Sequence, residues 1–441
     1  MGFLKNGFMI ILLSALLIMT TPIFVFADAG VSENEELKKE IAMLKERLSA
    51  LESRLERSEA KVVKIEKEKK PPETGLPAQI TSFAKEIEVH GSVDTSYIFN
   101  TNTPVAPNMQ TNNLRVFDRE ANGFMLNLAE LNFEKPISQE SPVGFRVDLA
   151  FGEDAEVFGA AGLGTTDDEF DLQQAYVQFY VPFSLPFMHA LNFKAGKFVT
   201  LHGAEVIESV DNWNFSRSFL FGYAIPFTHT GVRAYYKPFE NVPIESYIGI
   251  VNGWDNARDN NRAKTVEGSI TATPFENISF TVNGIFGPER ANSNKDFRNL
   301  IDFVATYKVF DKLTLKANYD YGWEKNGASA TAGSRNGKDA TWDGIAAYAK
   351  YDILDWWSIA GRGEFFHDRE GVRTGVLTSA TMPITDLELW EFTLTSEFRL
   401  YNNLLTRLEY RYDKASGQAF TKDKLTSNHQ GTVSAEVIYK F

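Results

Sequence analysis

The stretch that decides the fold is GTVSAEVIYKF, residues Gly431–Phe441. Apolar residues occupy the odd positions from Val433 to Phe441, and mostly polar residues occupy the even positions from Thr432 to Lys440. Successive side chains of a β-strand point to opposite faces, so this strand has one apolar and one largely polar face. In water the apolar face would be an aggregation-prone edge, whereas in an outer membrane it would face lipid. The stretch therefore predicts the closing strand of a transmembrane β-barrel.

The same period of two starts at Glu86 and continues along the sequence. It is clearest in Leu313–Trp323 and Trp390–Leu400, where nearly every second residue is apolar or aromatic. Residues 122–134 and 244–252 alternate less regularly, and we expect a bulge in each. Sixteen segments fit a strand, at residues 86–99, 122–134, 143–151, 170–182, 191–199, 230–237, 244–252, 264–273, 277–286, 300–309, 312–323, 342–351, 356–366, 387–400, 404–412 and 430–441.

The connections between these segments have two lengths. Tight ones such as Phe310–Lys312 and Tyr401–Asn403 alternate with long polar ones such as Glu324–Thr341 and Asp413–His429. Outer-membrane barrels have an even number of strands, short periplasmic turns and long outer loops, whereas a soluble β-sandwich shows no such rhythm. The predicted fold class is all-β: a 16-stranded antiparallel transmembrane β-barrel over residues 86–441, preceded by an N-terminal α-helical coiled coil.

The first 85 residues have a different organisation. Lys5, the apolar run 8–18 and Val25–Ala27 predict a signal peptide over residues 1–27, with an uncleaved membrane anchor as the alternative. An a/d heptad seam predicts a periplasmic coiled-coil stalk at residues 32–69, and a Pro-containing linker follows at 70–85. The seam suits an oligomerisation stalk or a monomeric charged spacer, and it does not distinguish a dimer from a trimer.

Composition excludes several classes of function. The 441 residues carry a net charge of −13, which argues against a nucleic-acid partner and mildly favours cations. There is no cysteine, so disulfide scaffolds, thiolate metal sites and covalently attached haem are excluded. Aromatic residues make up 13% of the chain, as the two aromatic girdles of a membrane barrel require.

The third long connection, residues 200–229, is the longest and the richest in apolar side chains. A loop that stayed in water would not carry so many of them, so we expect it to fold inward onto the barrel wall. There it would narrow the pore. Packing on the outer rim or into a neighbouring subunit is the alternative. The candidate constriction residues are Glu205, Glu208, Asp211 and Arg217.

Several motifs resemble the β-barrel porins called OmpL-like. They are Asn127–Leu131, Gly196–Phe198, Gly203–Glu205, Asn212, Ser216–Ser218, Pro226–Gly231 and Asn252–Asp255. The resemblance covers about residues 86–441 and is strongest from 120 to 260. It implies a passive diffusion channel in the outer membrane for small hydrophilic solutes or ions, and it names no substrate. The third loop is also similar to the constriction loop of trimeric diffusion porins, which favours a homo-oligomer, with a trimer formed through the barrel wall and the coiled coil. Tyr439 and Phe441 resemble the signal that outer-membrane proteins present to the barrel-assembly machinery.

The late strands place opposite charges in the lumen. Four arginines form a candidate basic strip: Arg362, Arg399, Arg407 and Arg411. Such a strip opposite an acidic loop would create a transverse field that orients solutes. Four glutamates share the same faces, so salt bridges that stiffen the wall are the competing interpretation: Glu364, Glu391, Glu397 and Glu409.

No catalytic or metal-ligand constellation is evident. The six histidines form no HxH or HExxH array, and His202 and His229, which bracket the third loop, are expected to hydrogen-bond backbone rather than act in catalysis. We therefore expect no enzyme, cofactor or metal site. The expected partners are outer-membrane lipid, the assembly machinery and small solutes or ions. Two alternatives remain open: a structural barrel tethered by its coiled coil, and a solute-specific channel.

Overall fold

The computed structural model describes residues 85–441, except 106–110, 139, 164–168, 186–187, 238–242, 332–333, 336 and 380–381. The chain divides into two compact units, Met1–Ser82 and Phe83–Phe441, and the described residues all belong to the second. The predicted signal peptide, coiled-coil stalk and linker lie outside the described residues, apart from Lys85 at the end of the linker.

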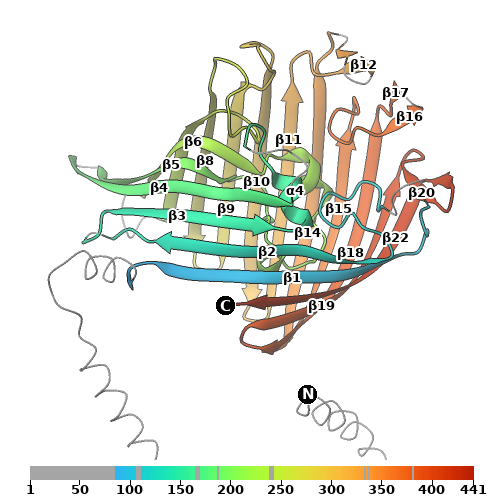
Figure 1. The fold of residues 1–441 in the computed structure, drawn as a ribbon, viewed down its shortest axis with the longest axis horizontal. Coiled ribbons are helices and arrows are strands. Elements are labelled where there is room, and N and C mark those ends of the chain that lie inside the picture. Colours follow the sequence, from blue (N-terminus) through green and yellow to red (C-terminus); the bar gives the residue numbers. More distant parts are fainter. Residues whose placement is uncertain are drawn as a thin grey trace, which may run out of the picture. The chain divides into compact units, whose positions relative to one another are not determined.

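Sixteen strands form one closed barrel, in which each strand pairs with its neighbour in the chain and β1 pairs antiparallel with β22 (Figure 1). The barrel strands are β1 (Glu88–Asn100), β2 (Gly123–Lys135), β3 (Val143–Phe151), β4 (Phe170–Leu185), β5 (Met188–Val199), β6 (Thr228–Tyr236), β7 (Ile244–Val251), β8 (Thr265–Phe275), β9 (Ile278–Pro288), β10 (Phe297–Phe310), β11 (Leu313–Glu324), β14 (Ala340–Leu354), β15 (Trp357–Asp368), β18 (Leu387–Tyr401), β19 (Leu404–Ala415) and β22 (His429–Lys440).

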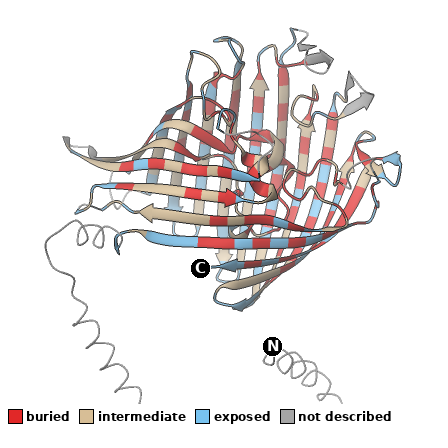
Figure 2. Ribbon diagram, viewed as in Figure 1, coloured by how far each residue is buried: buried red, intermediate tan, exposed pale blue. Residues whose placement is uncertain are grey.

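The strands alternate between a buried face and an exposed face, as the bands along the arrows in Figure 2 show. On β22, Val433 and Val437 are exposed while Ser434 and Glu436 are buried. The exposed faces are apolar, and exposed aromatic side chains lie near both ends of the strands, for example Phe124, Phe297, Phe310, Tyr351 and Tyr401. An apolar outer band flanked by aromatic girdles is the surface that a lipid bilayer requires. The buried polar faces therefore line the lumen.

All sixteen strand segments predicted from the sequence are confirmed. The bulge expected in 122–134 is also confirmed, because Asp94 pairs with Leu128 and Thr95 with Leu126, leaving Asn127 as the extra residue. The bulge expected in 244–252 is wrong, since β7 pairs with both neighbours without a shift in register. The inward residue Tyr247 packs against Tyr235 on β6, with ring centroids 4.9 Å apart, so the lumen-facing side of this strand is partly aromatic.

Tight turns such as Asp311–Lys312 and Asn402–Asn403 join the strands at one end of the barrel, here called the turn end. Long connections at the opposite, loop end carry α4 (Glu153–Phe158) and three short hairpins: β12 (Ser329–Thr331) with β13 (Ser334–Arg335), β16 (Leu377–Ser379) with β17 (Met382–Pro383), and β20 (Phe420–Lys422) with β21 (Leu425–Ser427). The third loop, residues 200–227, contains η1 (Ser209–Asp211) and η2 (Leu220–Ala224). No helix among the described residues is long and apolar enough to cross a membrane.

Candidate functional site: the third loop in the barrel lumen

The third loop lies against the inward faces of strands β10 to β22. Its backbone and side chains contact lumen-facing residues of β10, β11, β14, β15, β18, β19 and β22. The chain therefore enters the barrel after β5 and follows the wall before it returns to β6, as its apolar composition predicted. The outer-rim alternative does not describe this loop.

Two lumen carboxylates hold the loop through its backbone. Glu364 on β15 accepts the amide hydrogens of Phe219 and Leu220, with N–O distances of 2.7 and 2.5 Å. Glu409 on β19 accepts those of Phe215 and Ser216 at 2.7 and 3.0 Å. An irregular segment away from bulk water must find partners for its peptide groups, and carboxylates make strong ones. These two glutamates therefore act as clamps on the loop rather than as partners of the arginine strip.

The start of the loop is attached to another part of the wall, on β10 and β11. Asp302 on β10 accepts the amide hydrogen of Gly203 at 3.0 Å, and Asn318 on β11 accepts that of Ala204 at 3.0 Å. Lys316, also on β11, donates to the carbonyl oxygen of Ala204 at 2.8 Å. The wall thus holds the loop at its start through these contacts and in its second half through Glu364 and Glu409.

The apolar side of the loop contributes to a core at the loop end of the barrel. Phe219, Leu220 and Ile225 are buried there together with Phe117 from the first loop and Phe158 from α4. Figure 1 shows α4 inside the ring of strands. The sequence analysis placed only the third loop inside the barrel. The apolar residues of the first loop, Leu114, Val116 and Phe117, carried the same compositional signal and were missed.

The four candidate constriction residues fall into two groups. Glu205 and Arg217 are buried: Glu205 accepts the amide hydrogen of Ser218 at 2.8 Å, and Arg217 is 3.1 Å from the carboxylate of Asp154 on α4. Glu208 and Asp211 instead line cavities on the turn side of the loop. Burial raises the pKa of the Glu208 carboxyl, and the Asp211 carboxylate adds to that increase.

Three members of the basic strip are neutralised by carboxylates. Arg362 lies 2.7 Å from Glu391 and 2.6 Å from Glu205. Arg407 pairs with Glu397 and Glu436, and Arg411 pairs with Asp413. All three arginines are 1% exposed. Arg399 differs, because its side chain is 43% exposed while it pairs with Glu397. Salt bridges therefore account for most of the strip, and Arg399 is the member that faces open space.

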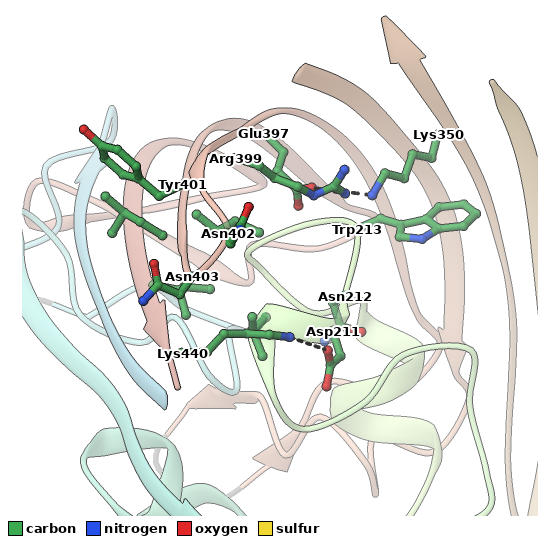
Figure 3. A pocket seen from close by; sticks show the side chains of 14 residues that line it. Asp211, Asn212, Trp213, Lys350, Glu397, Arg399, Tyr401, Asn402, Asn403 and Lys440 are labelled. Carbon is green, nitrogen blue, oxygen red and sulfur yellow. Dashed lines mark hydrogen bonds and ion pairs between the residues drawn. The ribbon is translucent and has the colours of Figure 1, made fainter. Parts of the chain in front are cut away.

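Two cavities lie on the turn side of the loop. Their linings share Val210, Asp211, Asn402, Asn403 and Lys440. The cavity of about 360 Å³ beside the β18–β19 turn is here called the turn cavity (Figure 3). The larger cavity, of about 570 Å³, lies along β1 to β5 and is called the wall cavity. Lys194 and Arg146 line the wall cavity, and the ammonium of Lys194 lies 4.6 Å from the ring centroid of Tyr176. The sequence analysis did not single out these wall residues.

The histidines at the ends of the loop make local hydrogen bonds. His229 Nδ1 lies 2.9 Å from the carbonyl oxygen of Gly253, as expected of a histidine that bonds backbone. His202 Nδ1 lies 3.0 Å from the hydroxyl of Thr200, so its partner is a side chain instead. Burial lowers the pKa of His202 to about 3, which keeps this imidazole neutral at ordinary pH.

A carboxyl group just beyond β9 organises the fourth loop. Glu289 Oε2 accepts the amide hydrogen of Trp254 at 2.8 Å, and Oε1 accepts the hydroxyl hydrogen of Thr265 at 2.7 Å. Burial raises the pKa of Glu289 to about 7, against the hydrogen bonds that favour its ionised form. The fourth loop is therefore attached through a group that titrates near neutrality.

The two aromatic residues of the predicted assembly signal lie on the outer face at the turn end. Tyr439 and Phe441 are 45% and 57% exposed, and their ring centroids are 6.3 Å apart. Phe441 exchanges two backbone hydrogen bonds of 3.0 Å with Gly91 on β1. Gly91 leaves room for the aromatic ring, since a Cβ atom there would lie 2.5 Å from Cζ of Phe441.

A closed sixteen-stranded antiparallel barrel with an apolar belt, a polar lumen and an inward third loop defines the class of outer-membrane porins. The chain belongs to the family described as "Putative beta-barrel porin-2, OmpL-like", whose profile matches residues 86–441. It is thus an outer-membrane β-barrel of a porin family, a class of channels rather than enzymes. The family predicted from the motifs is confirmed.

Solved structures share this fold at low sequence identity. The anion-selective porin from Comamonas acidovorans aligns with a TM-score of 0.54 and 12% identity, over 80% of this chain and 99% of that one. The outer membrane channel DcaP of Acinetobacter baumannii aligns with a TM-score of 0.52 and 12% identity, over 80% and 97%. These likenesses concern the fold alone. No curated protein matches the chain.

Proposed function

We propose that this protein is a passive diffusion channel for small hydrophilic solutes or ions, narrowed by the third loop. The observation that carries the proposal is the clamped path of the loop along the inner wall, with accessible polar cavities on its turn side. A rigid loop across a polar lumen restricts passage without closing on a bound solute, and this suits movement down a gradient. In an outer membrane the turn end faces the periplasm.

Within this proposal the four constriction candidates have two roles. Glu208 and Asp211 narrow the path, because they line the cavities on either side of the loop tip. Glu205 and Arg217 hold the loop in shape through buried contacts. Arg399, the exposed member of the basic strip, faces the turn cavity across from Asp211.

Single-channel conductance of the refolded protein in a planar bilayer tests the proposal. We expect a steady ohmic current whose cation preference falls in Glu208→Gln/Asp211→Asn. Glu88→Gln/Asp311→Asn is the matched control, since both side chains are well exposed at the turn end, away from the loop. An unchanged preference would refute the constriction assignment. No current from a folded barrel would refute the channel.

The second candidate function is a structural barrel tethered by its predicted coiled coil. One observation favours it: the first, second and fourth loops share the buried core of the third loop, through Phe117, Phe158 and Trp254. Such a core could fill the loop end completely. A folded barrel with no conductance would support this candidate.

We also propose a homo-oligomer, with a trimer favoured. Native mass spectrometry of the chain with and without residues 32–69 separates a trimer held by the barrel wall from one held by the predicted stalk. A monomer in both forms would refute the oligomer.

A further inference from the structure

We propose that the turn cavity is a binding subsite for small aromatic carboxylates. This inference deepens the proposed channel function and rests on it, since a solute passing the third loop would meet this cavity next. The cavity measures about 360 Å³ and lies between the loop tip at Val210–Trp213 and the β18–β19 turn. Its volume falls within the range of small-molecule sites.

The charged groups in and next to the cavity lining carry a net positive charge. Glu397 forms ion pairs with three cations: Arg407 at 2.9 Å, Arg399 at 2.7 Å and Lys350 at 3.5 Å. Arg407 also pairs with Glu436 at 3.0 Å. Two carboxylates therefore neutralise only two of the three cations. This excess lies in a chain whose net charge is −13, so it is a local feature of the site.

Two of the three cations that line the cavity, Lys350 and Arg399, have donors to spare. Figure 3 shows Lys350 and Arg399 together beside Glu397, on the same side as Trp213. Among the described residues, Lys350 has only the 3.5 Å contact with Glu397, and the Arg399 side chain uses a single N–H group. The amides of Asn402 and Asn403 also line the space. A guanidinium beside an ammonium is a suitable receptor for a carboxylate.

The remaining charged pair of the lining is weak. Lys440 lies 3.8 Å from Asp211, and both side chains are more than half exposed, at 55% and 64%. Exposed pairs of this kind contribute little and rearrange easily. Lys440 can therefore turn to an incoming anion without loss of a strong contact.

Trp213 gives the cavity an aromatic wall. The indole is half-buried, with Tyr348 edge-on at 6.5 Å and the ammonium of Lys316 over its ring at 4.7 Å. A flat ring stacked or placed edge-on against an indole gains about 0.5–1.5 kcal/mol beyond its burial. Inorganic anions would gain nothing from this wall.

The combination selects a ligand with one carboxylate on a flat apolar body. Benzoate is the probe of choice because three related compounds separate the requirement for a carboxylate from the requirement for an aromatic ring. Acetate has the charge without the ring, benzyl alcohol has the ring without the charge, and benzylammonium carries the opposite charge.

Binding is measured first, on the folded protein in detergent, by ¹⁹F-NMR line broadening of 4-fluorobenzoate with displacement by the unlabelled compounds. We expect benzoate to displace the probe at lower concentration than acetate or benzyl alcohol, and benzylammonium not to displace it. Lys350→Gln/Arg399→Gln should weaken binding at least tenfold, and Trp213→Leu should weaken benzoate but not acetate. Lys308→Gln/Lys312→Gln, which removes two exposed cations at the turn end, is the matched control.

Measurement of the single-channel current with benzoate present then separates the subsite proposal from the channel proposal. Saturable reduction of the current by benzoate, relieved in the double variant, supports both proposals. A conducting barrel that does not bind benzoate, or that binds benzylammonium equally well, overturns the subsite alone. A barrel that binds benzoate through these residues but carries no current retains the subsite and overturns the channel.

Discussion

The clamps on the third loop predict a measurable change in backbone protection. Glu364 and Glu409 each accept two amide hydrogens of the loop, at 2.5–2.7 Å and 2.7–3.0 Å. Glutamine in place of either glutamate keeps one acceptor oxygen and sets an NH₂ group against the second amide. One charge-assisted hydrogen bond, worth about 1.5–3 kcal/mol, is then lost at each site.

That loss should appear as faster hydrogen exchange. Since about 1.4 kcal/mol corresponds to a tenfold change in an equilibrium constant, we expect exchange of the loop amides to accelerate about 10- to 100-fold in either single variant. The measurement is hydrogen–deuterium exchange with mass spectrometry on the refolded barrel, read in peptides covering residues 213–222. Glu245→Gln is the matched control, because this glutamate bonds Tyr235 at 2.6 Å rather than the loop.

The reasoning would be refuted by equal exchange in the wild type and both variants. Such a result would mean that the apolar core alone holds the loop, and that the carboxylates serve another purpose. Exchange that accelerates equally in Glu245→Gln would point to general loosening of the barrel instead.

Three further predictions concern attachment at other points of the barrel. The pKa of Glu289 is raised to about 7 from an ordinary 4.5, so the folded state holds this proton more tightly; the stability that it provides is complete below pH 4.5 and is lost as the pH rises to 7. In the wild type this titration lowers the unfolding free energy by about 3 kcal/mol between pH 4.5 and pH 8. Glu289→Gln should abolish that decrease, as measured by urea titration at both pH values. An unchanged pH profile would contradict this prediction. Gly91→Val should displace Phe441 and lower the yield of folded barrel on heat-modifiability gels, whereas Gly123→Val, where a Cβ meets no atom within 4 Å, should not. Phe219→Ala should cost about 3–5 kcal/mol of stability, seen as a lower Tm, because its side chain is 1% exposed; a Tm like that of the wild type would show that the loop core is dispensable.

The barrel could be predicted from the sequence because each strand carries its own signal. Apolar alternation marks one face for lipid whatever lies on the other face. β11 follows it over its length, and β22 follows it from Thr432 to Tyr439. The signal weakens where the lumen itself holds apolar side chains. On β7 the inward Tyr247 made the alternation irregular, and the sequence analysis mistook this for a bulge.

The interior could be predicted only in part. Composition indicated that the third loop must pack inside, but the pairing of charges depends on positions that only the folded chain defines. Glu364 and Glu409 share a face with the arginines, so ion pairs were the natural expectation. In the structure they bind peptide amides of the loop instead. The periodicity of the sequence predicts strands, but it does not predict where the N–H groups of an irregular loop will lie.

Charge selectivity illustrates the same limit. The net charge of −13 suggested a preference for cations, yet the screening length is about 8 Å at physiological ionic strength, so a solute responds to the charges near it rather than to the net charge of the chain. Buried pairs such as Arg407 with Glu436 cancel locally. The field that a solute meets is then determined by the few charges that remain accessible. Glu208 lines the wall cavity, whereas Lys350 and Arg399 line the turn cavity. The wall cavity carries mixed charges, since Arg146 and Lys194 line it together with Glu208. Two adjacent regions with different charge arrangements would favour solutes by shape and charge position rather than by net charge alone, and this is the behaviour that separates a subsite from a simple filter.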